Sequence, residues 1–397
     1  MAAPREIRIG LLWHGRGSGN LGIGALTVGN ILCARAAAEA LGLTPRFTLL
    51  EFANDFDEPY VEGPDIDAFE ITTKSMLSPA GYWSRIGKLD CILDIGAGDS
   101  FTDIYSSKRF GFLWLSKAMA WLRGVPLLFS PQTIGPFKRQ PHTALASWAM
   151  KRAFAVVARD PQSFAAIGQM APGAKAVQAV DVAFRLPFDR PARAAGGPLE
   201  IGVNVSGLLF NGGYTGGNEF GLQVDYADLM RRFIAEMLAR PGVRVHLITH
   251  ATGDKLPMDD DGRVADRLAA EFPAAVRPPN FPSPSAAKSY IAGMDFLVAG
   301  RMHACIGAYS AGVPVVPIAY SRKFSGLFQG VLGYDFGVPV SGMSTEEALG
   351  YLRTCVDDRA RLAEAVRAGQ AVVEGALAAY DTELRALFTS ATERKAR

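Results

Sequence analysis

The sequence has few of the residues that mark specialised classes of protein. Its 397 residues include only four cysteines and five histidines, and no cysteines are spaced as a CxxC pair or a zinc ribbon. Lysine and arginine (41) nearly balance aspartate and glutamate (39), so the net charge of +2 gives no reason to expect a nucleic-acid partner. No glycine repeat and no heptad repeat is present, which excludes collagen-like and coiled-coil structures.

Long hydrophobic runs are missing as well. The most apolar stretch, residues 110–129, contains Lys117, Arg123 and a Gly-Val-Pro turn, and is too broken to span a bilayer. The N-terminus leads directly into a strand-like run without the apolar segment of a signal peptide. We therefore expect a cytoplasmic protein with no transmembrane segment, whose cysteines are buried and reduced.

Short apolar runs alternate along the chain with longer amphipathic ones. The strand-like runs of the first half are Ile7–Trp13, Phe47–Phe52, Cys91–Ile95, Pro126–Ser130, Ala155–Ala158 and Val177–Ala179, and the helix-like runs include Ala25–Leu41, Phe112–Arg123 and Thr143–Ala153. This alternation predicts an α/β fold, with parallel sheets covered by helices on both faces.

A Pro-, Gly- and Ala-rich segment interrupts the alternation and is typical of an interdomain linker. Beyond it lie strand-like runs at Ile201–Val205, Val243–Thr249, Asp295–Ala299 and Val313–Ile318, and a helix-like run at Asp228–Arg240. The pattern predicts an N-terminal α/β domain at residues 1–186, a linker at 187–198, a C-terminal α/β domain at 199–345 and C-terminal helices at 346–397. Because ligands bind at the carboxyl ends of parallel strands, we expect the chemistry in loops that follow strands, in a cleft between the halves.

The loop after the first strand is rich in glycine. Gly17, Gly19 and Gly22 formally match the GxGxxG dinucleotide fingerprint, and Glu51 closes the second strand, where a ribose-binding acid would lie. The unit from Ile7 to Glu51 is, however, longer than the roughly 30 residues of that fingerprint. We therefore favour a flexible loop whose glycines let a ligand approach the backbone closely.

Polar side chains follow the next two strands of the N-terminal half. Asp99 and Ser100 lie in a glycine-rich turn, where their oxygens could accept hydrogen bonds from sugar hydroxyls or cap the next helix. Gln132 follows the next strand, where its amide could bind a ligand or belong to a rigid Pro-Gly turn. Both interpretations stay open for each group.

Charged residues follow two further strands. Arg159-Asp160 comes directly after Ala155–Ala158, either as a pair that faces the cleft or as a structural ion pair with Asp160 as a helix N-cap. Asp181 similarly follows a strand. These residues are candidates for the same edge of the sheet.

The sharpest local signal lies in the C-terminal half, where a strand turns at Gly300 into a helix. Arg301 and His303 fall in the first turn of this helix, where backbone N–H groups and the helix dipole favour an anion. Lys323 follows the next strand and adds another cation. A guanidinium, an imidazole and an ammonium group at adjacent strand ends predict a binding site for phosphate or carboxylate.

A histidine and three aspartates follow another strand of this half. A metal site could be built from His250 with Asp259, Asp260 and Asp261, but the spacing is not specific. We interpret the aspartates as solvated loop acids.

In this order the motifs resemble the polysaccharide pyruvyl transferase family, over nearly the whole chain up to about Phe328. The resemblance rests on Gly19–Gly22 (Gly-Asn-x-Gly), Gly98–Asp103, Gln132–Pro136, Arg159-Asp160, Asp181–Phe184, Ile201–Ser206, Arg301-Met302-His303, Gly312–Pro314 and Lys323. The sequence departs from the family pattern at Ile23-Gly24, where acidic residues are usual.

The resemblance implies two Rossmann-like domains facing a cleft, similar to the GT-B glycosyltransferase fold. It also implies a donor, phosphoenolpyruvate, and an acceptor, a sugar of a bacterial cell-surface polysaccharide or its precursor, which are joined as a pyruvate ketal. The residues that would bind phosphoenolpyruvate are Arg159, Arg301, His303 and Lys323. Those that would face the acceptor, on the N-terminal side, are Asn20, Gly22, Asp99, Ser100 and Gln132. We assign no metal and no cofactor to this reaction.

The proposed chemistry needs a proton donor and a proton acceptor. His303 is the candidate for protonating the methylene carbon or assisting the departure of phosphate, and Asp99 or Asp181 would accept the hydroxyl proton. These roles are hypotheses that substitution of each residue tests.

Two other functions stay open. One is a GT-B nucleotide-sugar glycosyltransferase, and the other is a non-catalytic family member that binds a glycan or an anion. The sequence also leaves open which sugar is modified, whether the chain forms a homo-oligomer, and whether the acceptor is lipid-linked. A lipid-linked acceptor would bring the protein to the inner membrane face.

Overall fold

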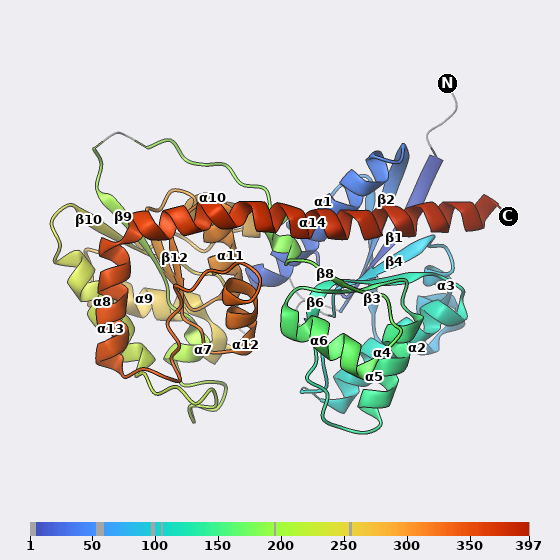
Figure 1. Ribbon diagram of the computed structural model, residues 1–397, viewed down its shortest axis with the longest axis horizontal. Coiled ribbons are helices and arrows are strands. Elements are labelled where there is room, and N and C mark those ends of the chain that lie inside the picture. The colour runs from blue at the N-terminus through green and yellow to red at the C-terminus, as the bar shows by residue number, and fades with distance from the viewer. Residues whose placement is uncertain are drawn as a thin grey trace. The chain divides into compact units, whose positions relative to one another are not determined.

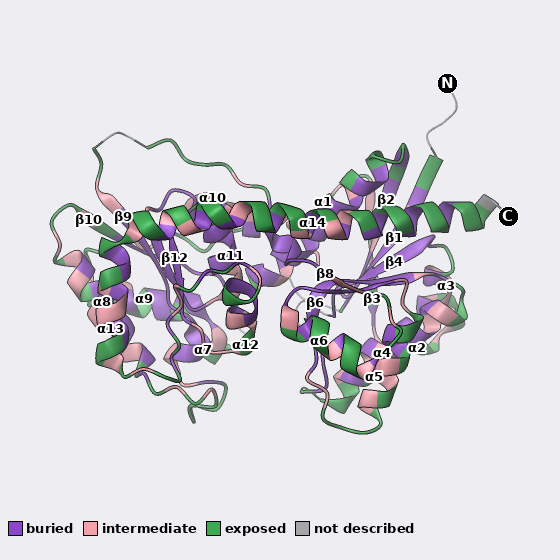
Figure 2. Cartoon of the chain, viewed as in Figure 1, coloured by how far each residue is buried: buried purple, intermediate pink, exposed green. Residues whose placement is uncertain are grey.

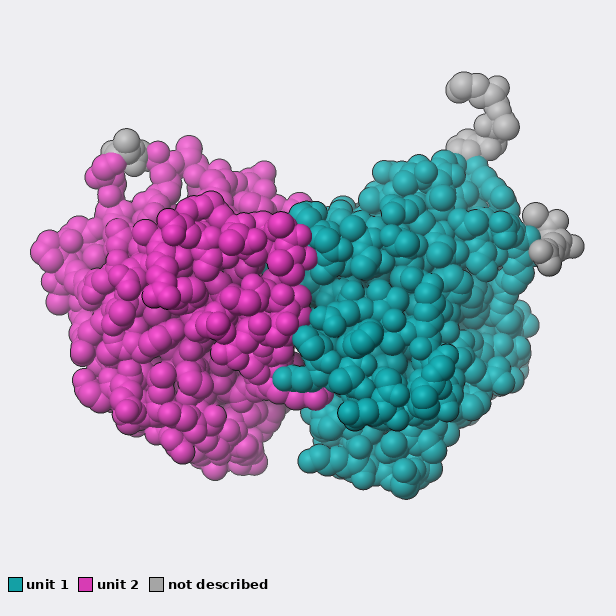
Figure 3. All heavy atoms as spheres, viewed as in Figure 1, with its two compact units in different colours: residues 1–18, 26–185, 373–397 teal, residues 19–25, 186–372 magenta. Residues whose placement is uncertain are grey.

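The computed structural model of the chain describes residues 5–52, 59–96, 100–104, 106–193, 196–253 and 256–396. The chain divides into two compact units, which Figure 3 distinguishes by colour. Unit 1 comprises residues 1–18, 26–185 and 373–397, and unit 2 comprises residues 19–25 and 186–372. A piece of the first loop and the C-terminal helix therefore pass from one unit to the other.

Unit 1 is built on an eight-stranded parallel sheet with the order β3-β2-β1-β4-β6-β7-β8, in which β5 pairs with β6. Its strands are β1 (Arg5–Leu12), β2 (Leu43–Phe52), β3 (Ile66–Ile71), β4 (Cys91–Asp94), β5 (Ser100–Phe101), β6 (Leu127–Ile134), β7 (Val156–Ala158) and β8 (Ala176–Gln178). All six predicted strands of this half are confirmed. Strand β3 was not predicted because, as an edge strand, it fully buries only Ile71 and so lacks an apolar run.

Helices cover both faces of this sheet. One face packs against α1 (Leu21–Glu39) and the C-terminal part of α14 (Arg359–Ala396), and the other packs against α4 (Ser107–Leu122), α5 (His142–Arg152) and α6 (Pro161–Met170). The central strands β4, β6 and β7 are buried along their whole length, and Figure 2 marks buried residues in purple. The shorter helices are α2 (Thr73–Leu77), α3 (Ser84–Ile86), the π-helix η1 (Pro79–Trp83) and the 3-10 helix η3 (Val182–Arg185). The predicted parallel sheet with two helical layers is confirmed.

Unit 2 contains a four-stranded parallel sheet with the order β10-β9-β11-β12. Its strands are β9 (Leu199–Asn204), β10 (Val243–Leu247), β11 (Phe296–Ala299) and β12 (Val315–Pro317). Its helices are α7 (Gly207–Phe210), α8 (Tyr226–Leu238), η4 (Pro257–Asp259), α9 (Asp261–Glu271), α10 (Pro284–Ile291), α11 (Met302–Ser310), α12 (Arg322–Phe324), η5 (Ser325–Gln329) and α13 (Thr345–Asp357). The four strands predicted for this half are confirmed.

Two long helices contribute to both units. Helix α1 starts in unit 2 and continues in unit 1, whereas the 38-residue α14, the longest helix drawn in Figure 1, leaves unit 2 after Val372. Among the described helices, α1 alone is long and apolar enough to cross a membrane, and 72% of its apolar window is buried in the fold. A helix in the core of a globular unit has the same composition. The four cysteines are also buried and free, as expected.

Candidate functional site

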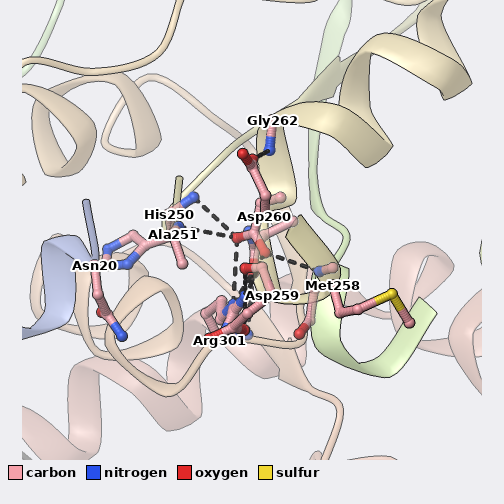
Figure 4. Close-up of polar contacts among 12 residues, drawn as sticks. Asn20, His250, Ala251, Met258, Asp259, Asp260, Gly262 and Arg301 are labelled. Carbon is pink, nitrogen blue, oxygen red and sulfur yellow. Dashed lines mark hydrogen bonds and ion pairs between the residues drawn. The ribbon is translucent and has the colours of Figure 1, made fainter. Parts of the chain in front are cut away.

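The carboxyl ends of the four strands of unit 2 each lead into a polar residue. Asn204 ends β9, His250 follows β10, Arg301 follows β11 and Tyr320 follows β12. Because all four strands are parallel, these residues lie at one edge of the sheet. Figure 4 shows the centre of this group, where Arg301 lies against Asp259.

Arg301 is the N-cap residue of α11. Its Nε and Nη2 donate hydrogen bonds to Oδ1 of Asp261 at 3.0 and 2.7 Å, and Nη2 also donates to the backbone oxygen of Asp259 at 2.7 Å. Nη2 further lies 2.6 Å from Oδ1 of Asp259 in an ion pair. Burial lowers the pKa of Arg301, but Asp261 and Asp259 outweigh this and raise it above its ordinary value. The guanidinium is thus already paired with two carboxylates. All of the contacts named here are made by Nε and Nη2, and none by Nη1.

Asp261 connects three of the loops at this edge. Its Oδ2 accepts hydrogen bonds from Nδ2 of Asn204 and from the backbone N–H groups of His250 and Ala251, each at 3.1 Å. Its Oδ1 accepts from the backbone N–H of Gly207 at 2.9 Å. One buried carboxylate therefore fixes the loops after β9, β10 and β11 relative to one another.

The interpretation of the aspartates as solvated loop acids is therefore wrong for Asp260 and Asp261. Asp261 is completely buried, and Asp260 is 7% exposed and caps α9. A run of acids suggests a surface loop because carboxylates are rarely buried without a partner. The sequence does not show that backbone donors and Arg301 converge on Asp261.

The glycine-rich first loop docks on the same group of loops within unit 2. The backbone N–H of Leu21 donates to the carbonyl of His250 at 3.0 Å, and the N–H of Thr252 donates to the carbonyl of Gly19 at 2.8 Å. These bonds hold the start of α1 beside the segment that follows β10.

Two glycines of this loop are required by close packing. An ideal Cβ on Gly19 would lie 1.7 Å from the carbonyl oxygen of Thr252, and one on Gly22 would lie 2.3 Å from Nδ1 of His303. The sequence suggested glycines that admit a ligand. At these two positions the close approach is instead made by the protein's own backbone and imidazole.

Two histidines lie beside Arg301. His303, in the first turn of α11, is half-buried. His250 is buried, and desolvation together with the charges of His303 and Arg301 lowers its pKa to about 3. His250 therefore stays neutral near pH 7.

An aromatic and a basic residue follow β12. Burial raises the pKa of Tyr320, although the charge of Arg301 opposes this. Burial also lowers the pKa of Lys323 to about 8. A pocket of about 310 Å³ opens beside Tyr320 and is lined in part by Arg322 and Phe324. Lys323 can thus change its charge within the working range of most enzymes.

In unit 1, the candidates Arg159 and Asp181 contact each other. Nη1 of Arg159 donates to Oδ2 of Asp181 at 2.7 Å, and its Nε donates to the hydroxyl of Thr133 at 3.0 Å. Both charged side chains are at most 3% exposed. Asp160 caps α6 instead. An ion pair and an N-cap are therefore both present, with Asp181 as the partner of the arginine.

The acceptor candidates of unit 1 that are described are buried. Ser100 in β5 and Gln132 in β6 are each 1% exposed. Nε2 of Gln132 donates to the backbone oxygen of Asp94 at 2.9 Å and so links β6 to β4. Asp99 lies outside the described residues.

Side chains of the first loop and of β2 hold that loop in place. Glu51 is 2% exposed and accepts hydrogen bonds from the backbone N–H and the Nε of Arg16 at 2.8 and 2.7 Å. Oδ1 of the exposed Asn20 accepts from the backbone N–H of Gly22 at 3.0 Å. Glu51 thus anchors the loop, in place of the ribose contact that the dinucleotide fingerprint would have required.

A family model described as polysaccharide pyruvyl transferase matches residues 28–322 of this sequence. The chain belongs to the polysaccharide pyruvyl transferase family. The resemblance based on the motifs is therefore confirmed, and the matched segment contains Arg159, Asp181, Arg301 and His303. No curated protein matches the sequence.

Solved structures of similar fold cover almost the whole chain of this pyruvyl transferase family member. Alr3699/HepE of Anabaena, in complex with UDP and glucose, is 14% identical with a TM-score of 0.57, over 97% of this chain and 100% of that one. Sucrose-phosphate synthase of Thermosynechococcus elongatus is 13% identical with a TM-score of 0.55, over 98% of each chain. A UDP-N-acetylglucosamine 2-epimerase is 11% identical with a TM-score of 0.54, over 95% of this chain and 97% of that one. At these identities the likeness concerns the fold alone, and it confirms a GT-B-like fold with two Rossmann-like halves.

Three polar residues of this site were given no binding or catalytic role from the sequence: Asn204, Asp259 and Asp261. Asn204 belongs to a strand that the family resemblance already included, which was the available signal. Asp259 and Asp261 offered only a loop-like acidic run. Within the described residues, no group of three or more His, Cys, Asp or Glu side chains is placed to hold a metal ion.

Proposed function

We propose that this protein transfers a pyruvyl group from phosphoenolpyruvate to a sugar of a cell-surface polysaccharide or its precursor, forming a ketal. The family match over residues 28–322 carries this proposal. It is supported by the position of Arg301 and His303 at the N-terminus of α11. There the anionic phosphoenolpyruvate could accept hydrogen bonds from backbone N–H groups and from side chains.

Phosphoenolpyruvate carries a phosphate and a carboxylate close together. Unit 2 offers them the N-terminal amides of α11, Nη1 of Arg301, the imidazole of His303 and the ammonium of Lys323. A helix N-terminus contributes about 0.3–1 kcal/mol, and up to about 2 kcal/mol when partly buried. Charge-assisted hydrogen bonds from the side chains must therefore supply most of the affinity.

Ketal formation requires a proton at the methylene carbon of the donor. Protonation turns this carbon into a methyl group and leaves an oxocarbenium-like centre at the neighbouring carbon. One sugar hydroxyl attacks that centre and loses its proton. Phosphate then leaves with its bridging oxygen, and a second hydroxyl attacks the same carbon, loses its proton and closes the ketal. We assign to His303 the proton delivered to the methylene carbon or to the departing phosphate.

The contacts of Asp181 favour a positioning role over that of a base. Its Oδ2 accepts from Arg159 and its Oδ1 accepts from the backbone N–H of Ala183 at 2.9 Å. A carboxylate engaged on both oxygens holds its arginine better than it takes a proton. Asp99 stays the candidate for accepting the hydroxyl proton.

A nucleotide-sugar glycosyltransferase is the second candidate. It is favoured by the similar fold of Alr3699/HepE, which was solved in complex with UDP-glucose. A diphosphate would use the same amides and cations at α11. The product distinguishes the two activities, because the glycosyltransferase releases a nucleoside diphosphate and the pyruvyl transferase releases phosphate.

The deciding experiment incubates the protein with phosphoenolpyruvate and free, nucleotide-linked and lipid-linked acceptor glycans. Phosphate release together with the added mass of a ketal on the acceptor supports the proposal. Thermal shifts separate the candidates further, because each ligand stabilises the folded chain by an amount that depends on its concentration relative to its dissociation constant. Stabilisation by a uridine or guanosine diphosphate sugar, without phosphate release from phosphoenolpyruvate, would replace the first function by the second.

A further inference from the structure

Asp259 and Asp261 contact the same guanidinium but are held differently. Asp261 is fully buried and accepts hydrogen bonds from backbone and side-chain donors of three loops. The side chain of Asp259 is 20% exposed, and its Oδ1 lies 2.6 Å from Nη2 of Arg301. This Oδ1 receives no hydrogen bond from the described residues. Asp259 is therefore the more loosely held of the two carboxylates.

The hydrogens of Nη2 explain this difference. This nitrogen of an arginine carries two hydrogens. Nη2 donates one bond to Oδ1 of Asp261 and one to the backbone oxygen of Asp259, each at 2.7 Å. Neither hydrogen remains for the Asp259 carboxylate, which is held by charge and not by a directional bond.

The backbone around Asp259 is fixed by bonds that do not involve its side chain. Asp259 is the last residue of η4, and the next residue, Asp260, caps α9 through hydrogen bonds to the N–H groups of Gly262 and Arg263. Rotation of the Asp259 side chain would break none of these bonds. Among the contacts described above, it would break the ion pair with Arg301.

The charges at this position are unfavourable for an anionic ligand. Asp259 and Asp261 place two negative charges on the single positive charge of Arg301. The charge of the Asp259 carboxylate also acts on Tyr214 and Tyr320. Burial is the main cause of the raised pKa of both tyrosines; the negative charge of Asp259 raises it further, and the positive charge of Arg301 lowers it. A phosphate or carboxylate entering beside Arg301 would meet this carboxylate first.

We propose that Asp259 determines the anion affinity of the site, because its carboxylate occupies the place beside Arg301 that the anionic group of the ligand takes. When the ligand binds, the Asp259 side chain turns away, and the anion meets the positive charge of Arg301 and its Nη1, while Nη2 keeps its bonds to Asp261 and to the backbone oxygen of Asp259. Asp261 stays in place and keeps the guanidinium oriented. The inference rests on the anion site of the proposed function, but it holds for any anionic donor.

The test compares Asp259→Asn with the wild-type chain and with Asp266→Asn. Asp266 is also in unit 2, on α9, and its side chain is 68% exposed and pairs with Arg277. The control therefore removes one negative charge from a position that is paired with Arg277 and not with Arg301. Dissociation constants for phosphoenolpyruvate, UDP and inorganic phosphate are measured by calorimetry at one ionic strength. We expect Asp259→Asn to bind the anion about fivefold more tightly, the effect of one screened charge pair, and Asp266→Asn to bind as the wild type does.

Each outcome has a defined meaning. If Asp259→Asn binds phosphoenolpyruvate more tightly than the wild type and Asp266→Asn does not, both the inference and the proposed function are supported. Tighter binding of UDP alone supports the inference and contradicts the proposed donor. Equal or weaker anion binding by a folded Asp259→Asn overturns the inference, as does an equal gain in Asp266→Asn. Failure of all three chains to bind any anion overturns both. Asp259→Ser, checked by its melting temperature, replaces the asparagine variant should that variant not fold.

Discussion

Nδ1 of His303 lies 2.3 Å from the place that a Cβ on Gly22 would occupy. The glycine comes from the first turn of α1 and the histidine from the first turn of α11, and both belong to unit 2. The glycine therefore leaves room for the imidazole orientation that the structure shows. A methyl group at this position would force the ring to move.

We expect Gly22→Ala to impair catalysis more than stability. The displaced ring of His303 loses its alignment, and overpacking of this kind costs about 1–3 kcal/mol in the free energy of unfolding. Turnover should fall by at least about tenfold, since even small misplacement of reacting groups slows catalysis strongly. Rates of phosphate release and urea denaturation measure the two effects. The control is Gly168→Ala in α6, where a Cβ meets nothing within 4 Å. Unchanged turnover in Gly22→Ala would show that the imidazole orientation does not matter.

Replacement of His303 tests its assignment as a proton donor. In His303→Gln, turnover should fall by about 10²- to 10⁴-fold, the usual contribution of a general acid. Binding of phosphoenolpyruvate, followed by thermal shift, should weaken much less, because the amides of α11 and Arg301 remain. Imidazole added to His303→Ala should restore part of the activity. Full turnover in either variant would remove His303 from the mechanism.

The affinity for phosphoenolpyruvate should decrease as the pH rises through about 8. Burial lowers the pKa of Lys323 to about 8, so this side chain is positively charged below that pH and neutral above it. Loss of the charge weakens the attraction for the anionic donor. In Lys323→Met the affinity should be lower at pH 7 and should no longer fall across this range.

Lys288 provides the matched control for this titration. Burial lowers its pKa to about 8 as well, but its ammonium donates to the backbone oxygen of Leu186. Lys288→Met should therefore keep the pH dependence of donor binding. Because both lysines bind protons more weakly in the folded than in the unfolded state, each should make the fold more stable as the pH rises from about 8 toward the ordinary lysine value. A pH dependence of donor affinity that survives in Lys323→Met would assign it to another group.

Arg159 and Asp181 should behave as one buried unit. Arg159→Met leaves the Asp181 carboxylate buried without its cation, which typically costs about 3–5 kcal/mol in the free energy of unfolding. The double variant Arg159→Met/Asp181→Asn should recover part of that loss, since it removes both charges. A double-mutant cycle by urea denaturation gives the coupling energy. Strictly additive losses would mean that the 2.7 Å contact contributes nothing to stability.

Patterns along the chain were sufficient to predict most of the fold. Apolar runs of four to eight residues predicted the central strands because a parallel sheet buries both of its faces. The edge strand β3 was not predicted because only Ile71 of its six residues is buried at the margin of the sheet. Helix starts were predicted less well: α1 begins at Leu21, within the glycine loop, because backbone bonds to the loop after β10 allow it to form there.

The sequence by itself determined the α/β class, the two-half organisation and the cationic residues that follow β11 and β12, because these depend on local periodicity and on the turn after each strand. Only the tertiary structure decided which acids engage Arg301, why Gly19 and Gly22 must be glycine, and that Arg159 pairs with Asp181. The physical reason is that a charged side chain is directed by all the groups that surround it. Those groups come from segments far apart in the chain, and their convergence leaves no periodic trace in the sequence.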